Sequence, residues 1–121
     1  MSQSTIDIEH LRGWIGRSQT DSDPALTRHA RLMAATIDRP GPALEDGDPL
    51  PHCWHWLYFL EGLPPGRLGP DGHPERGGFM PPVPLPNRMW AGGELRFEGE
   101  VPLGATMDKR STIKSVEHKT G

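Results

Sequence analysis

Cysteine is almost absent from this chain, and long apolar runs are absent altogether. Only Cys53 is a cysteine among 121 residues. No internal disulfide can therefore form, which is typical of proteins from a reducing compartment. No stretch approaches the roughly 18 apolar residues that a membrane-spanning helix needs. Residues 1–10 lack the basic flank and apolar core of a signal peptide. The sequence predicts a soluble, cytoplasmic protein without a membrane partner.

An excess of positive charge is also missing. The formal net charge is −3, so no bulk field draws the chain to nucleic acid or to anionic lipid. The length suffices for one domain and not for two. We expect a single domain over residues 1–121 that has no nucleic-acid partner.

Glycine and proline are abundant but unevenly spread. The chain has 15 glycines and 14 prolines, and sixteen of these 29 residues lie within positions 62–93. Structureless loops longer than about 12–15 residues are usually functional or disordered. Eight prolines stiffen this one, so we predict an ordered segment that wraps across the surface of the domain.

Helical patterns come before this segment. Residues 4–16 form the first, with Ile8, Leu11 and Ile15 at helical spacing. Asp23-Pro24 is a strong signal for a second helix start, and Pro40-Gly41 ends that helix. Residues 52–61 hold half of the eight aromatic residues on nearly all sides, which predicts a helix buried on most faces.

Strand patterns follow the loop. Residues 90–101 alternate apolar and charged side chains, and residues 105–116 form a second strand after a turn. Helices followed by strands indicate an α+β fold. Two strands alone are marginal in water, so we expect the sheet to be incomplete here and the remaining strands to come from further polypeptide.

The residues give weak signals for catalysis or metal binding. His52, Cys53 and His55 lack a fourth ligand and the usual paired spacing of a metal site, and no base is evident that would activate Cys53. Asp71 with His73 forms a candidate acid–base pair, but Asp71-Gly72 is first a turn signal. We predict no metal, no cofactor and no catalytic residue within this chain.

One long segment resembles a known family. The run Pro51-His52-Cys53-Trp54-His55-Trp56-Leu57-Tyr58-Phe59, followed by residues 68–93, is similar to the N-terminal half of mesaconyl-CoA and 3-methylfumaryl-CoA hydratases. These enzymes are MaoC-like dehydratases with a FAS1-like dehydratase N-terminal domain. The resemblance implies a hot-dog fold, in which an antiparallel sheet wraps around a central helix, and makes this chain the truncated first half of a double hot-dog.

The same resemblance implies a hydro-lyase that adds water across an α,β-unsaturated acyl-CoA. The acid–base pair of MaoC-like enzymes is an Asp and a His in one motif. Asp38 lacks the downstream His, and the spacing from Asp48 to His52 is one residue too short. We therefore expect this chain alone to be inactive and a catalytic C-terminal half to complete the site. A separate subunit with a catalytic partner, a homodimer, and a thioesterase-like hot-dog protein remain open alternatives.

The substrates of the enzymes that this chain resembles carry a distal carboxylate. An Arg, whose planar fork holds both oxygens, suits such a group. Arg88 ranks first because it lies between a rigid proline run and a predicted strand, while pairing with a surface carboxylate is the alternative. Arg67 and Arg76 lie nearer flexible glycines and rank lower, and the phosphates of CoA are their alternative partners. We expect acyl-CoA contacts at seven positions: Arg67, His73, Arg76, Arg88, Trp90, Gly92 and Gly93.

Overall fold

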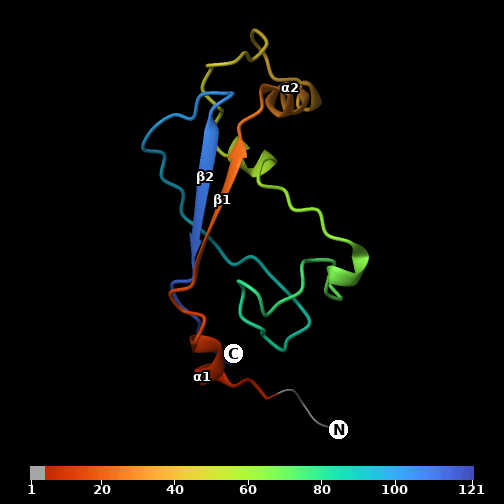
Figure 1. Cartoon of the computed structure of the whole chain (residues 1–121), viewed down its shortest axis with the longest axis vertical. Helices are drawn as coiled ribbons and strands as arrows, with labels where there is room; N and C mark the ends of the chain where they lie inside the picture. Colours follow the sequence, from red (N-terminus) through yellow and green to blue (C-terminus); the bar gives the residue numbers. More distant parts are fainter. Residues whose placement is uncertain (1–4) are drawn as a thin grey trace. The chain divides into compact units, whose positions relative to one another are not determined.

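The computed structural model describes residues 5–121. Its elements are α1 (Ile8–Arg12), β1 (Ser18–Pro24), α2 (Thr27–Thr36), two single turns of 3-10 helix, η1 (Trp54–Leu57) and η2 (Pro65–Arg67), and β2 (Thr106–Thr112), as Figure 1 shows. The α+β class is confirmed. Over the described residues, no helix has both the length and the apolar character to cross a membrane.

The chain divides into two compact units. The first unit contains the described part of Met1–Thr20, together with Gly62–Gly92 and Arg110–Gly121. The second contains Asp21–Glu61 and Gly93–Lys109. The proline-rich loop thus belongs to the first unit, and the aromatic segment belongs to the second.

Strands β1 and β2 form one two-stranded antiparallel sheet (Figure 1). At one end the N–H of Gly16 donates to the carbonyl of Ile113 at 2.8 Å, and at the other the N–H of Ala25 donates to the carbonyl of Ala105 at 2.8 Å. Strand β2 confirms the prediction of a strand within residues 105–116. Strand β1 was not predicted, because its sequence Ser-Gln-Thr-Asp-Ser-Asp-Pro has no apolar alternation.

Asp23-Pro24 does not start the second helix, which corrects the sequence prediction. These two residues end β1, and α2 begins at Thr27 with no side-chain cap. The Asp23 carboxylate accepts a hydrogen bond from the N–H of Phe59 at 2.8 Å instead. The Asp23 carboxylate, which the sequence suggested as a helix cap, therefore binds the backbone N–H of a residue distant in sequence.

The first predicted helix is shorter than residues 4–16. Ser4 lies outside the described residues. Helix α1 covers only Ile8–Arg12, where the Asp7 carboxylate accepts from the N–H of His10 at 3.1 Å and so caps the helix. Leu11 is buried, while Ile15 is exposed in the turn that follows.

The predicted buried helix over residues 52–61 is wrong. Only the single turn η1 forms there. Cys53 before it and Phe59 after it have positive φ angles of 73° and 57°, and Tyr58 is extended. A left-handed residue at each side of the turn interrupts the right-handed path. Trp56 consequently remains 63% exposed.

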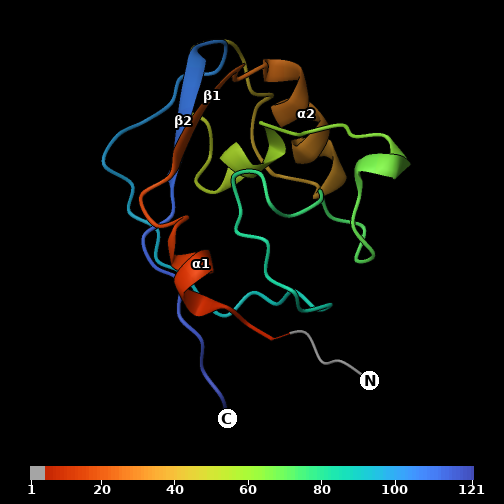
Figure 2. The same cartoon turned by 60° about the horizontal axis from the view of Figure 1, so that its bottom comes forward.

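The predicted strand over residues 90–101 is also wrong. This segment has no strand partner and runs as an extended loop (Figure 2). Leu95 and Phe97 are half exposed, although the ring of Phe97 stacks on that of His52 at 4.0 Å. Alternation of apolar and charged residues marks a strand only where a neighbouring edge is available for pairing.

The core lies in the second unit. Tyr58 is its largest member, and its hydroxyl donates to the carbonyl of Leu26 at 2.7 Å. The other members are small or aliphatic side chains from the link between β1 and α2, from α2 itself, from the acidic loop, from the turn before β2 and from β2: Ala25, Ala30, Leu44, Leu50, Leu103 and Met107.

Tyr58 should therefore contribute more to stability than the neighbouring Trp56. Truncation of a buried aromatic residue costs about 3–5 kcal/mol, so we expect Tyr58→Ala to lower the free energy of unfolding by about that amount. Trp56→Ala is the matched control and should change it by less than about 0.5 kcal/mol. Urea denaturation followed by circular dichroism measures both. Equal losses would show that the core does not centre on Tyr58.

Candidate functional site

The candidate site lies in the proline-rich loop of the first unit. Its foundation is a tight turn, in which the N–H of Gly69 donates to the carbonyl of His73 at 2.7 Å. Gly72 has a φ of 79°, a conformation that favours glycine. The Asp71 carboxylate accepts from the N–H of His73 at 3.0 Å. The predicted Asp71-Gly72 turn is confirmed.

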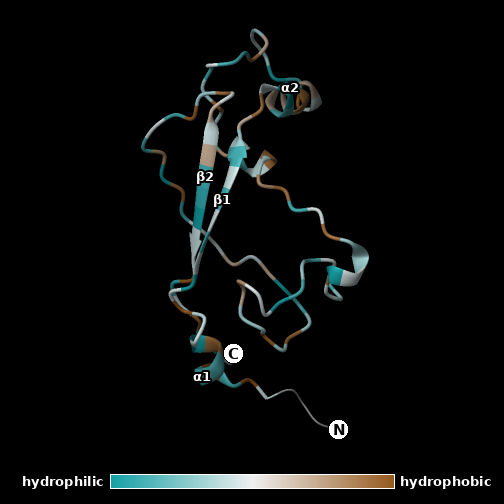
Figure 3. Ribbon diagram, viewed as in Figure 1, coloured by the Kyte–Doolittle hydropathy of each residue, from teal (hydrophilic) through white to brown (hydrophobic). Residues whose placement is uncertain are grey.

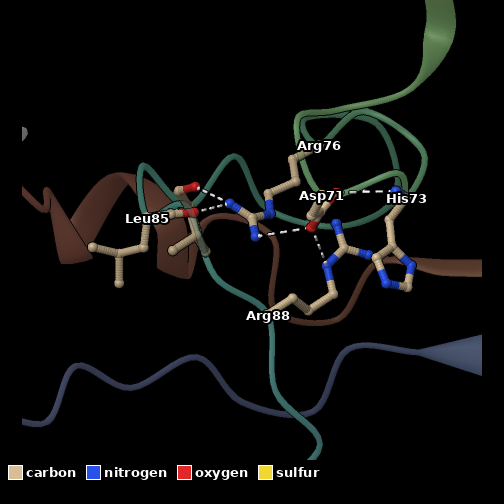
Figure 4. Close-up of polar contacts among 6 residues, drawn as sticks. Asp71, His73, Arg76, Leu85 and Arg88 are labelled. Atoms are coloured by element: carbon tan, nitrogen blue, oxygen red, sulfur yellow. Dashed lines mark hydrogen bonds and ion pairs between the residues drawn. The ribbon is translucent and has the colours of Figure 1, made fainter. Parts of the chain in front are cut away.

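The Asp71 carboxylate lies between two guanidinium groups (Figure 4). Its Oδ2 is 3.5 Å from Nε of Arg88 and 3.8 Å from Nη2 of Arg76. The Asp71 side chain is 19% exposed. The Asp71 carboxylate, whose position is fixed by its own turn, therefore forms ion pairs with two arginines.

The two arginines are bound very differently. Nη1 of Arg76 donates to the carbonyl of Val83 at 2.8 Å and also to the carbonyl of Leu85. Arg76 thus links the turn to the proline run that follows it. Within residues 5–121, the ion pair with Asp71 is the single polar contact recorded for Arg88, and its side chain is 33% exposed. Its terminal nitrogens are therefore available as donors.

A pocket of about 510 Å³ opens between these residues. That volume is within the range of small-molecule sites. Asp71, Arg76 and Arg88 contribute charged groups to its wall, and Glu75 contributes another. The remaining wall is largely apolar and comes from both halves of the loop: Leu68, Gly69, Pro70, Pro74, Val83, Pro84, Leu85 and Pro86.

The loop is tied to the N-terminal part of its unit at Gly78. The indole Nε1 of Trp14 donates to the Gly78 carbonyl at 3.0 Å, and Nη1 of Arg17 donates to the same oxygen at 3.3 Å. The guanidinium of Arg17 also lies 4.2 Å from the ring centre of Trp14. These contacts support the prediction that the loop is ordered.

The structure brings together only part of the predicted substrate-binding set. Arg76 and Arg88 line the pocket. His73 does not line the pocket; its backbone N–H donates to the Asp71 carboxylate. Four more predicted residues also lie outside the pocket wall and, like His73, stay untested predictions: Arg67, Trp90, Gly92 and Gly93. Asp71, which joins the two arginines, was not predicted to bind substrate. The sequence signal that could have indicated its role is an Asp-Gly turn close in sequence to several arginines.

The weaker sequence motifs do not assemble into a site. In the part of the chain that the structure describes, no three His, Cys, Asp or Glu side chains converge as metal ligands. The Asp48 carboxylate accepts from the N–H of Glu45 at 2.9 Å, while His52 stacks on Phe97. Asp38 lies just after α2 at a φ of 52°.

The surroundings of Asp71 favour its ionised form. The hydrogen bond from the His73 N–H lowers the pKa of Asp71 below its ordinary value, and the positive charges of Arg88 and Arg76 lower it further, against a partial desolvation. The carboxylate is therefore charged throughout the neutral range and holds its pairing with both arginines.

Comparisons with known proteins agree on one chemistry. Residues 53–121 match the family model of hydroxyacyl-thioester dehydratase type 2. The chain is also 41% identical over 108 residues to a mesaconyl-C(4)-CoA hydratase of Chloroflexus aurantiacus. That alignment covers 89% of this chain and 39% of the relative, so the chain spans about two fifths of the relative's length.

The lowered pKa of Asp71 predicts an acid-sensitive loop. A depressed folded pKa gives stability that is present above the unfolded pKa, about 3.9 for Asp, and lost as pH falls through the folded pKa. We expect the stability difference between wild type and Asp71→Asn to be constant from about pH 7 to 5 and to shrink below about pH 4. Carbon-13 NMR of the carboxyl group measures its titration directly. A midpoint above 4 would contradict the arrangement.

Proposed function

This chain belongs to the hydroxyacyl-thioester dehydratase type 2 family, a hot-dog family, and we propose that it is the acyl-binding, non-catalytic part of an acyl-CoA hydratase. The complete enzyme would add water reversibly across the double bond of an α,β-unsaturated acyl thioester. The named activity of the Chloroflexus relative supports this substrate class. Since that relative is much longer, a catalytic hot-dog half or partner subunit has a natural place beside this chain.

Hydration requires groups that the described residues do not combine. A base must take a proton from water, an acid must protonate the α-carbon, and N–H donors must stabilise the enolate oxygen. Asp48 and His52 are the nearest approach to an acid–base pair in sequence. Each is bound elsewhere, Asp48 to its own turn and His52 to the ring of Phe97. These contacts support assigning proton transfer to the partner half.

The difference between the two arginines carries the proposal for the pocket. Arg76 donates to backbone carbonyls and fixes the loop, whereas Arg88 keeps its terminal nitrogens available. A planar fork with two such donors matches the two oxygens of a carboxylate. The distal carboxylate of a mesaconyl-type acyl group would bind Arg88, while its carbon chain lies against Val83 and Leu85.

A chimera tests whether this chain can functionally replace the corresponding segment of a hydratase. The aligned segment of the Chloroflexus enzyme is replaced by this chain, and hydration of mesaconyl-C(4)-CoA is followed by chromatography. We expect activity from the chimera and none from this chain alone. A folded but inactive chimera would contradict the proposal, as would turnover by the chain alone that His52→Ala abolishes.

Arg88→Met tests the pocket in the complete enzyme. Loss of a charged contact worth about 1.4 kcal/mol or more lowers kcat/KM about tenfold, and we expect this loss for mesaconyl-C(4)-CoA. Crotonyl-CoA has no distal carboxylate and should be affected much less. Arg96→Met, which removes an exposed arginine outside both the pocket wall and the predicted binding set, is the matched control. Equal losses on both substrates would assign Arg88 to structure or to CoA binding.

A further inference from the structure

Asp71 contacts Arg88 through the Nε edge of its guanidinium. An arginine presents two edges with paired donors, one formed by Nε with a terminal nitrogen and one formed by the two terminal nitrogens. A carboxylate at Nε leaves the terminal edge for a second anion. The contact therefore orients Arg88 without using up its donors.

We infer that Asp71 is a positioning residue, which holds the guanidinium of Arg88 so that its terminal edge faces a ligand carboxylate. The inference rests on the proposed function and names the residue that sets its specificity. Asp71 itself would touch no substrate atom.

Asp71 is suited to this role because its own position is fixed from both sides. The N–H of His73 holds one carboxylate oxygen, within a turn closed by the Gly69–His73 hydrogen bond. Arg76 lies against the other oxygen and is itself fixed to the carbonyls of Val83 and Leu85. The backbone thus fixes the carboxylate, and the carboxylate in turn orients the guanidinium of Arg88 (Figure 4).

Fixing Arg88 matters because a free arginine side chain is costly to order. A long side chain loses rotamer entropy when a ligand immobilises it, and arginine is among the residues that lose most. Part of that cost is met in advance where the side chain is already held at Nε. The benefit goes only to ligands that place a carboxylate at the terminal edge.

The charges around the pocket define the ligand class. The pocket wall holds two arginines, Arg76 and Arg88, and two carboxylates, Asp71 and Glu75, so it has no excess of positive charge. A site that binds anions without selectivity would need an excess of positive charge on its wall. The pocket instead suits a short apolar acyl group that ends in one carboxylate, because Val83, Leu85 and the prolines supply an apolar wall.

Asp71→Asn in the complete hydratase tests the inference. Asparagine keeps an oxygen for the His73 N–H but removes the charge at Nε. We expect KM for mesaconyl-C(4)-CoA to rise about threefold to fivefold, the range of a partly exposed ion pair, with kcat almost unchanged. Kinetics on crotonyl-CoA should not change.

A double-mutant cycle separates positioning from a general structural role. If Asp71 acts through Arg88, Asp71→Asn should have almost no further effect on KM in an Arg88→Met background. In an Arg76→Met background its effect should persist. A full effect of Asp71→Asn beside Arg88→Met, or an equal effect on crotonyl-CoA, would overturn the inference and leave the proposed function intact. Only failure of Arg88→Met to separate the two substrates would count against the pocket itself.

Discussion

The pairing of β1 with β2 is the constraint on which the described fold depends. It joins residues about 90 positions apart, from the Gly16–Ile113 hydrogen bond to that between Ala25 and Ala105. Strand β1 has no apolar side chain for packing, as its teal and white ribbon shows in Figure 3. Its attachment rests on backbone hydrogen bonds and on polar pairs such as Ser22 with Asp108 at 2.5 Å. The small core assembles where this ladder ends, around Ala25 and Leu103.

The candidate site depends on a different kind of order. Proline fixes φ, so the run from Pro81 to Pro86 loses little entropy on folding and needs few contacts to hold it. Arg76 supplies two of these contacts and Gly78 supplies the anchor to the N-terminal turn. A loop with almost no regular structure can therefore hold charged groups in fixed positions, which is what a binding site requires.

Local signals predicted the parts of the structure that local chemistry decides. The turn at Asp71-Gly72, the ordered loop and strand β2 all followed from turn residues, proline content and alternation. Strand β1 and the segment over residues 52–61 did not, because both depend on distant partners. A polar segment became a strand through β2, while an aromatic segment was interrupted at Cys53 and Phe59. No pattern within either segment encodes that outcome.

Charge balance explains how such a pocket can discriminate between anions. A wall with net positive charge attracts any anion, including the phosphates of the CoA moiety, and its effect fades with salt. Here Asp71 and Glu75 offset Arg76 and Arg88. If Arg88 binds a ligand carboxylate as proposed, the attraction is short-ranged and depends on whether that carboxylate meets the terminal edge of Arg88 at the right depth. In the proposed complex, discrimination would come from the position of the negative charge within the ligand, which is the feature that separates one acyl group with a distal carboxylate from another of the same total charge.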